Sequence, residues 1–204
     1  MRMQSRIKGL SLVELMVTIL VMAMLMAYAV PRFRDVLARG SVASTTNSFT
    51  ADVQFARGQA ASQHRFVSIC RSTTGTTCAE VTSGAFDYDM GWMVYSYDVT
   101  TDGPNQPYST TKGNMDILRY TPRVRGVSLR SSDGKLFTFD QTGQFVTSTG
   151  RTQLSFVACA RTPQELDTDH LGVNVSGMQG SLVTLRPTGS MTVVPLPLTS
   201  SCLL

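Results

Sequence analysis

Charged residues are scarce in this sequence. They make up 16% of its 204 residues, a low fraction for a cytosolic protein, and the formal net charge is +4. Three basic residues, Arg2, Arg6 and Lys8, lie ahead of a long apolar run, and without them 15 basic residues stand against 14 acidic ones. Bulk charge therefore gives no reason to class the rest of the chain as a nucleic-acid binder. A hydrophobic content of 42% excludes a disordered or collagen-like chain.

The motifs of the common catalytic classes are missing as well. The chain has no G-x-S-x-G nucleophile elbow, no H-E-x-x-H zinc motif and no P-loop. His64 lies in an Ala/Ser/Gln stretch, which favours a solvated side chain over a catalytic one. The acidic segment 167–170 could ligate a metal, but an exposed loop is the simpler interpretation, and Trp92 is interpreted as a core residue. We therefore expect no enzyme activity, no metal and no cofactor.

Glycine and proline are absent from residues 10–30, a segment of 21 residues dominated by Leu, Met and Ala. As an α-helix this segment is about 31 Å long, enough to cross the hydrocarbon core of a bilayer. The basic leader before it predicts an N-terminus in the cytoplasm and a translocated domain after it. The polar atoms of the segment belong to Ser11, Glu14, Thr18 and Tyr28.

A cleaved secretory signal is one interpretation of this segment, because Ala27-Tyr28-Ala29 fits an A-x-A cleavage site. Glu14 argues against it. A carboxylate inside an apolar membrane segment costs about 2.5–3.5 kcal/mol on insertion scales and tends to mark function. A signal peptide that is discarded has no use for that charge.

The segment from Lys8 to Met16, KGLSLVELM, resembles the type IV prepilin signature. In that family a peptidase cuts after a glycine, here Gly9, and the new N-terminal residue, here Leu10 in place of the usual Phe, is N-methylated. The fifth mature residue of the family is a glutamate, which here is Glu14, and the proline typical of the twenty-second position is Pro31. The resemblance implies a leader over residues 1–9 and a retained transmembrane helix over residues 10–30.

Physical chemistry gives Glu14 and Pro31 roles that fit the resemblance. A buried charge persists only when it is paired, so the Glu14 carboxylate is expected to neutralise the Leu10 α-amine of a neighbouring subunit in a filament. Pro31 lacks the helical N–H and is expected to kink or loosen the helix where it leaves the membrane. The alternative is that Pro31 begins a separate soluble helix.

After the membrane segment the pattern is first amphipathic and then β-rich. Apolar residues at a spacing of three or four predict a helix over residues 31–62 that packs on a sheet, with a bend or frayed turn at 40–48, where helix formers are few. Residues 140–143 are expected to form a hairpin turn, and residues 100–107 and 162–170 exposed loops. The predicted fold is α+β, a long N-terminal helix on antiparallel sheet, with a β-rich domain over residues 63–204. Strands are predicted at 66–70, 92–97, 117–120, 126–130, 136–139, 144–147, 153–159, 172–175, 182–185 and 191–194.

Four short segments carry a second resemblance: FARGQA at 55–60, VSICRS at 67–72, GTTC at 75–78 and GWMVY at 91–95. Their order and spacing are similar to those of the GspH/FimT family of minor pilins and pseudopilins, over about residues 1–100. The family implies a periplasmic pilin-like domain, held at the bacterial inner membrane, that joins a type IV pilus or a type II secretion pseudopilus. The partners it implies are other minor and major pilins, the prepilin peptidase/methyltransferase and the inner-membrane assembly platform.

All four cysteines follow the membrane segment, which suits an oxidising periplasm and two disulfides. Of the three pairings, Cys70 with Cys78 is favoured because seven intervening residues with Gly75 close easily. That choice leaves Cys159 to bind Cys202 and hold the C-terminal tail. A zinc site is the alternative, although C-x₇-C is not a ligand spacing.

A basic segment raises the question of nucleic-acid binding. Arg119, Arg123 and Arg125 share one face of an extended chain, and with Arg130 they form a candidate anion- or DNA-binding strip. The alternative is a solvated edge strand protected by charge. The basic G-R-x-R with which some family members bind DNA is replaced here by Gly-Ser-Leu-Val at 180–183. We therefore expect a minor type IV pilin that primes assembly and lies near the pilus tip; the alternatives are a type II secretion pseudopilin and a DNA-uptake pilin.

Overall fold

The computed structural model describes residues 11–79, 87–98, 103–162 and 171–204. The chain divides into two units, one ending at Leu37 and the other running from Ala38 to Leu204. Each unit is described by itself. The predicted loops at 100–107 and 162–170 lie partly outside the described residues.

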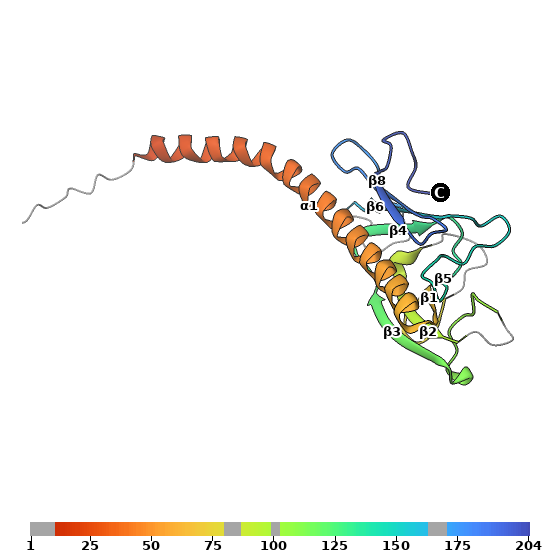
Figure 1. The fold of residues 1–204 in the computed structure, drawn as a ribbon. Helices are drawn as coiled ribbons and strands as arrows, with labels where there is room; N and C mark the ends of the chain where they lie inside the picture. Colours follow the sequence, from red (N-terminus) through yellow and green to blue (C-terminus); the bar gives the residue numbers. More distant parts are fainter. Residues whose placement is uncertain (1–10, 80–86, 99–102, 163–170) are drawn as a thin grey trace, which may run out of the picture. The chain divides into compact units, whose positions relative to one another are not determined.

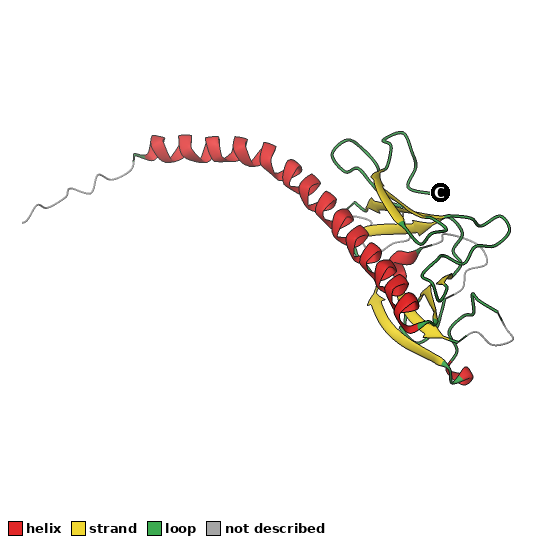
Figure 2. Ribbon diagram, in the orientation of Figure 1, coloured by secondary structure: helices red, strands yellow, loops and turns green. Residues whose placement is uncertain are grey.

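Helix α1 runs from Leu12 to Gln63 without interruption (Figures 1 and 2). Pro31 lies inside this helix and does not begin a second one. The bend expected at residues 40–48 is wrong, because that segment is helical throughout. Val42, Thr45 and Thr46 are buried there, so packing against the domain outweighs their weak helix propensity.

The first unit consists of the N-terminal half of this helix. Every side chain from Leu12 to Arg34 is exposed. The helix is long and apolar enough to cross a membrane, by length and composition, with a mean hydropathy of 2.2 over 18 residues. One helical segment therefore presents apolar side chains on all sides, as a segment surrounded by lipid or by other helices does.

The second unit is an antiparallel β domain covered by the rest of α1. One sheet has the order β3 (Met115–Pro122), β2 (Gly91–Tyr97), β1 (Phe66–Arg71), β5 (Phe137–Phe139). The other has the order β4 (Val127–Ser131), β6 (Leu154–Ala160), β7 (Ser181–Leu185), β8 (Met191–Pro195). Two short 3₁₀ helices, η1 (Tyr88–Met90) and η2 (Thr110–Lys112), complete the described elements. The α+β fold predicted from the sequence is confirmed.

Two predicted strands are not formed. Residues 144–147 contribute only an isolated bridge between Phe145 and Phe139, and residues 172–175 only bridges at Val173 and Val175. The turn before the first of them does form, because the Asp140 carboxylate accepts hydrogen bonds from the backbone of Thr142 and of the residue at 144. The Val146 N–H then donates to the carbonyl of Thr138 in β5, but the Phe145 N–H donates to the carbonyl of Pro187, so the pairing with β5 stays at an isolated bridge.

Phe49 of α1 is the point at which the helix meets both sheets. Its ring lies 5.3 Å from that of Trp92 in β2, 4.6 Å from that of Phe156 in β6 and 5.8 Å from that of Tyr88 in η1. All four rings are fully buried. Aromatic contacts at these separations stabilise a core beyond simple area burial, so helix and sheets share one core.

Candidate functional site

The N-terminal turn of α1 carries the residues expected to act in processing and assembly. Gly9 and Leu10 lie outside the described residues, so the cleavage site stays a prediction. Ser11 precedes the helix and its Oγ accepts a hydrogen bond of 3.2 Å from the Val13 N–H, which makes it a helix cap. Glu14 lies in the first turn with an exposed side chain. The S-x-x-E spacing of Ser11 and Glu14 is the local sequence signal for this helix start.

A buried carboxylate, Asp52, joins α1 to the first sheet. It is 4% exposed. It accepts hydrogen bonds from Trp92 Nε1 at 2.9 Å and from Thr121 Oγ1 at 2.8 Å, and it pairs with Arg119 Nη1 at 2.5 Å. The Arg119 guanidinium also lies 4.0 Å from the centroid of the Phe55 ring. Arg119 therefore holds the helix to the sheet.

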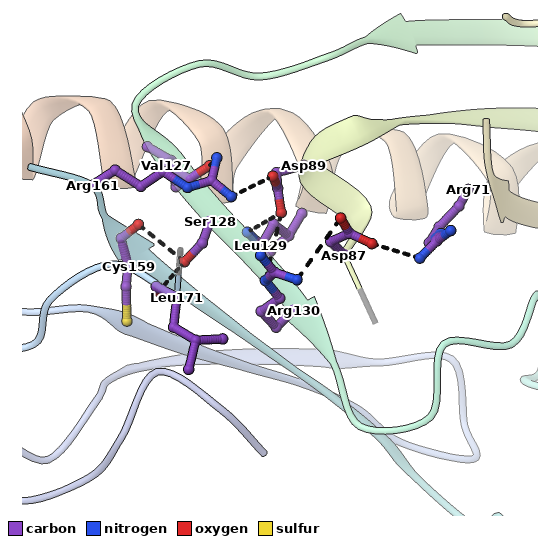
Figure 3. A network of polar contacts seen from close by, with 10 residues as sticks. All are labelled: Arg71, Asp87, Asp89, Val127, Ser128, Leu129, Arg130, Cys159, Arg161 and Leu171. Atoms are coloured by element: carbon purple, nitrogen blue, oxygen red, sulfur yellow. Dashed lines mark hydrogen bonds and ion pairs between the residues drawn. The ribbon is translucent and has the colours of Figure 1, made fainter. Parts of the chain in front are cut away.

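A second polar cluster, the η1 network, connects the two sheets through the 3₁₀ helix (Figure 3). Arg71 from β1 pairs with Asp87 at 2.6 Å, and Arg161, which follows β6, pairs with Asp89 at 2.7 Å. Arg130 from β4 lies within 3.8 Å of Asp87 and 3.9 Å of Asp89. Figure 3 shows the two carboxylates in the middle, with an arginine on each side and Arg130 beneath them.

Burial makes this network sensitive to the loss of any member. Arg130 is 0% and Asp89 1% exposed, and Asp89 also accepts the Leu129 N–H at 3.1 Å. Burial raises the pKa of Asp87, and the charge of Asp89 raises it further against the opposing effect of Arg71 and Arg130. Removing one member would leave another buried charge without a partner, which strongly destabilises a fold. The paired groups therefore hold η1 in its position between the sheets.

The basic strip expected from the sequence is not one surface. Arg130 is a core residue of the η1 network, which makes its assignment to an anion-binding surface wrong. Arg119 is bound to Asp52, while Arg123 and Arg125 are exposed in the turn between β3 and β4. The expected extended chain ends at Pro122 because β3 and β4 belong to different sheets. Gly126, at φ +75°, provides the left-handed residue of that turn.

Both disulfides favoured from the sequence are present in the structure. Cys70 is bonded to Cys78 across a separation of 8 residues, and Cys159 to Cys202 across 43. The second bond lies in a small apolar cluster with Val157 and Leu196. It therefore fastens the C-terminal tail to β6, the central strand next to β4.

The remaining candidates of the sequence fall into ordinary structural places. His64 is exposed and follows α1 at φ +52°, the left-handed conformation that ends many helices. Trp92 is a core residue, as interpreted from the sequence. Residues 167–170 lie outside the described residues. Across the described ranges, no three His, Cys, Asp or Glu side chains come together in a way that could hold a metal ion.

Fold and site together define a class of protein. A single helix is apolar and exposed over its N-terminal half, and its other half covers an antiparallel, disulfide-bonded β domain. This is the architecture of a pilin-like protein, in which the helix anchors the subunit and the domain is presented outside the membrane.

Comparison with known proteins identifies the family. The family model described as Type II transport protein GspH matches residues 45–179, and that of the prokaryotic N-terminal methylation motif matches residues 4–30. The chain therefore belongs to the GspH family, and its role is that of a structural subunit of the minor pilin and pseudopilin class. A search of curated proteins finds no match.

Two crystal structures of the type IV minor pilin FimU of Pseudomonas aeruginosa are similar to this chain. In one crystal form the TM-score is 0.47 at 17% sequence identity, covering 80% of this chain and 96% of that one. In the other form the TM-score is 0.46 at 17% identity, covering 78% and 98%.

Proposed function

We propose that this protein is a minor type IV pilin of the bacterial inner membrane. Prepilin peptidase cuts after Gly9, Leu10 is N-methylated, and the helix from Leu12 onward holds the subunit with its N-terminus in the cytoplasm and its domain in the periplasm. The subunit then joins other minor and major pilins on the inner-membrane assembly platform. It primes the filament and remains near its tip.

The observation that carries this proposal is the uncovered half of α1. This apolar helix is exposed on every side and contains a carboxylate in its first turn. It is suited first to a lipid bilayer and then to a bundle of helices in a filament. It dissolves in lipid before assembly and packs among other helices afterwards. Glu14 gains a partner only in the second environment, where the α-amine of a neighbouring Leu10 can neutralise it. Pro31, where the apolar segment ends, loosens the helix for that transfer.

The pseudopilin of a type II secretion system remains the second candidate, because the matching family model is described by that system. A DNA-uptake role has less support. Arg119 is paired with Asp52 and Arg130 is buried among the carboxylates of the η1 network. Only Arg123 and Arg125 remain, in one exposed turn.

Deletion of the gene in its host separates the two candidates. We expect fewer surface pili, restored by the wild-type gene, and recovery of the tagged protein in sheared pili. Loss of protein secretion with normal piliation would instead favour the pseudopilin. Gel retardation of DNA by the purified full chain, at low and high salt, tests the third role, and we expect no binding at either.

A further inference from the structure

The two sheets end in four edge strands, and three of these edges are closed to a further strand. The β3 edge carries charged Asp116 and Arg119, and its pairing with β2 shifts register, which twists an edge away from partners. The β5 edge is only three residues long and Phe139 is already bridged to Phe145. The β4 edge is bridged to Asp87.

Strand β8, blue in Figure 1, differs from the other three edges. It contains no charged residue, and its Val193 and Val194 side chains are 48% and 46% exposed. Natural sheets seldom leave an uncharged, β-branched edge open, because such an edge invites another strand. Pro195 ends the strand and removes the donor at that position.

The hydrogen-bond pattern shows which backbone groups this edge offers. The Leu196 N–H donates to Gly180 at 2.8 Å and the Arg186 N–H donates to Ser190 at 2.9 Å, just outside the two ends of the β7–β8 ladder. Antiparallel residues alternate between facing the partner strand and facing away. Met191 and Val193 therefore direct their N–H and C=O groups away from β7, toward an incoming strand.

A groove of about 460 Å³ lies beside this edge. Its lining includes Val193, Val194 and Leu198, all exposed apolar side chains, and a single charged residue, Arg39. Arg39 donates through Nε to the Gly177 carbonyl at 2.5 Å, and among the described residues its two terminal nitrogens have no partner. The groove thus combines backbone donors and acceptors, an apolar surface and one cation, Arg39. Within the described part of the chain, no acidic side chain lines the groove to pair with that cation.

We propose that the β8 edge is a docking site for an extended strand of another prepilin-type subunit, which pairs with Met191 and Val193 and places a carboxylate on Arg39. This inference rests on the proposed function. The charge of the groove decides between partners. A second copy pairing through the same edge would bring a second Arg39 and no carboxylate, because the groove lining contains no acid. Arg39 is also the second residue of the domain, so the groove lies where the chain enters it.

Site-specific photo-crosslinking in the host tests this inference. The full-length chain carries Val193→p-benzoylphenylalanine, and the matched control carries the same residue at Ile117, which is 41% exposed on the β3 edge. The other prepilin-type subunits of the host are epitope-tagged, and crosslinked peptides are identified by mass spectrometry. We expect a peptide from a β-strand of one of these subunits at position 193 and little or none at position 117.

Charge reversal adds a second readout in the same background. Arg39→Glu should lower the crosslink yield by about tenfold or more, whereas Arg39→Lys should largely retain it. Fluorescence of buried Trp92 verifies that each variant is folded. A crosslink to a second copy, to a helix of a partner, equal yields at 193 and 117, or no crosslink at all would each overturn the inference. Sheared pili from the same cells report separately on the proposed function: a chain present in pili but uncrosslinked at 193 refutes only the docking site.

Discussion

The two disulfides should contribute unequally to the stability of the domain. In the chain-entropy model a disulfide stabilises the folded state because it lowers the conformational entropy of the unfolded chain. This effect grows with the length of the loop that the disulfide closes. A separation of 43 residues gives about 4 kcal/mol for the Cys159–Cys202 bond, and a separation of 8 gives about 2.5 kcal/mol for Cys70–Cys78. Replacing both cysteines of a pair by serine should therefore cost more for the long loop, by about 1.5 kcal/mol.

Urea unfolding of the purified full-length chain measures this difference directly. Trp92 is the single tryptophan and is fully buried, so its fluorescence reports on the core that helix and sheets share. The Cys159→Ser/Cys202→Ser variant should unfold at lower urea than the Cys70→Ser/Cys78→Ser variant. On the proposed topology it should also be less abundant and less protease-resistant in the periplasm, with normal leader cleavage, because the peptidase would act on the other side of the membrane. Equal losses, or a larger loss for the short loop, would refute the reasoning.

Three further predictions concern single residues. Replacing Glu14 by Leu should leave membrane insertion and cleavage intact but reduce recovery in sheared pili; equal recovery of variant and wild type would exclude the pairing role. Phe49→Ala should lower the free energy of unfolding by about 3–5 kcal/mol, because it empties the centre of the core, and a loss below 1 kcal/mol in urea unfolding would contradict that packing. Burial raises the pKa of Asp140, but hydrogen bonds from Thr142, Gln144 and Gly143 outweigh it and hold the pKa below 3.8. Its ionised form therefore stabilises the fold above pH 3.8, and the difference in unfolding free energy between wild type and Asp140→Ala should shrink as pH falls through the folded pKa; a difference independent of pH would contradict this.

The sequence predicts the class of fold well because its signals are local. The membrane segment follows from composition, and eight of the ten predicted strands correspond to β1–β8 within a residue or two. The bend predicted at 40–48 was wrong because packing against the domain, a tertiary effect, overrides weak helix propensity. The burial of Asp52 could have been predicted from the sequence. Asp52 lies on the apolar stripe of the helix, three residues after Phe49 and four before Ala56.

The η1 network could not be read from the sequence. Arg161 and Asp89 are 72 residues apart, and no local pattern indicates that they meet. Arg130 appeared to belong to a surface strip because Arg119, Arg123 and Arg125 lie near it in sequence. β3 and β4 belong to different sheets, so Arg130 is separated from the other three arginines and its side chain is buried in the core.

The most direct test of the account is intact-mass spectrometry of this protein recovered from sheared pili. We expect a chain that begins at Leu10, carries one N-terminal methyl group and keeps the whole of α1. A chain that begins at Val30, as the A-x-A cleavage would produce, or the absence of the protein from pili that are otherwise intact, would contradict it.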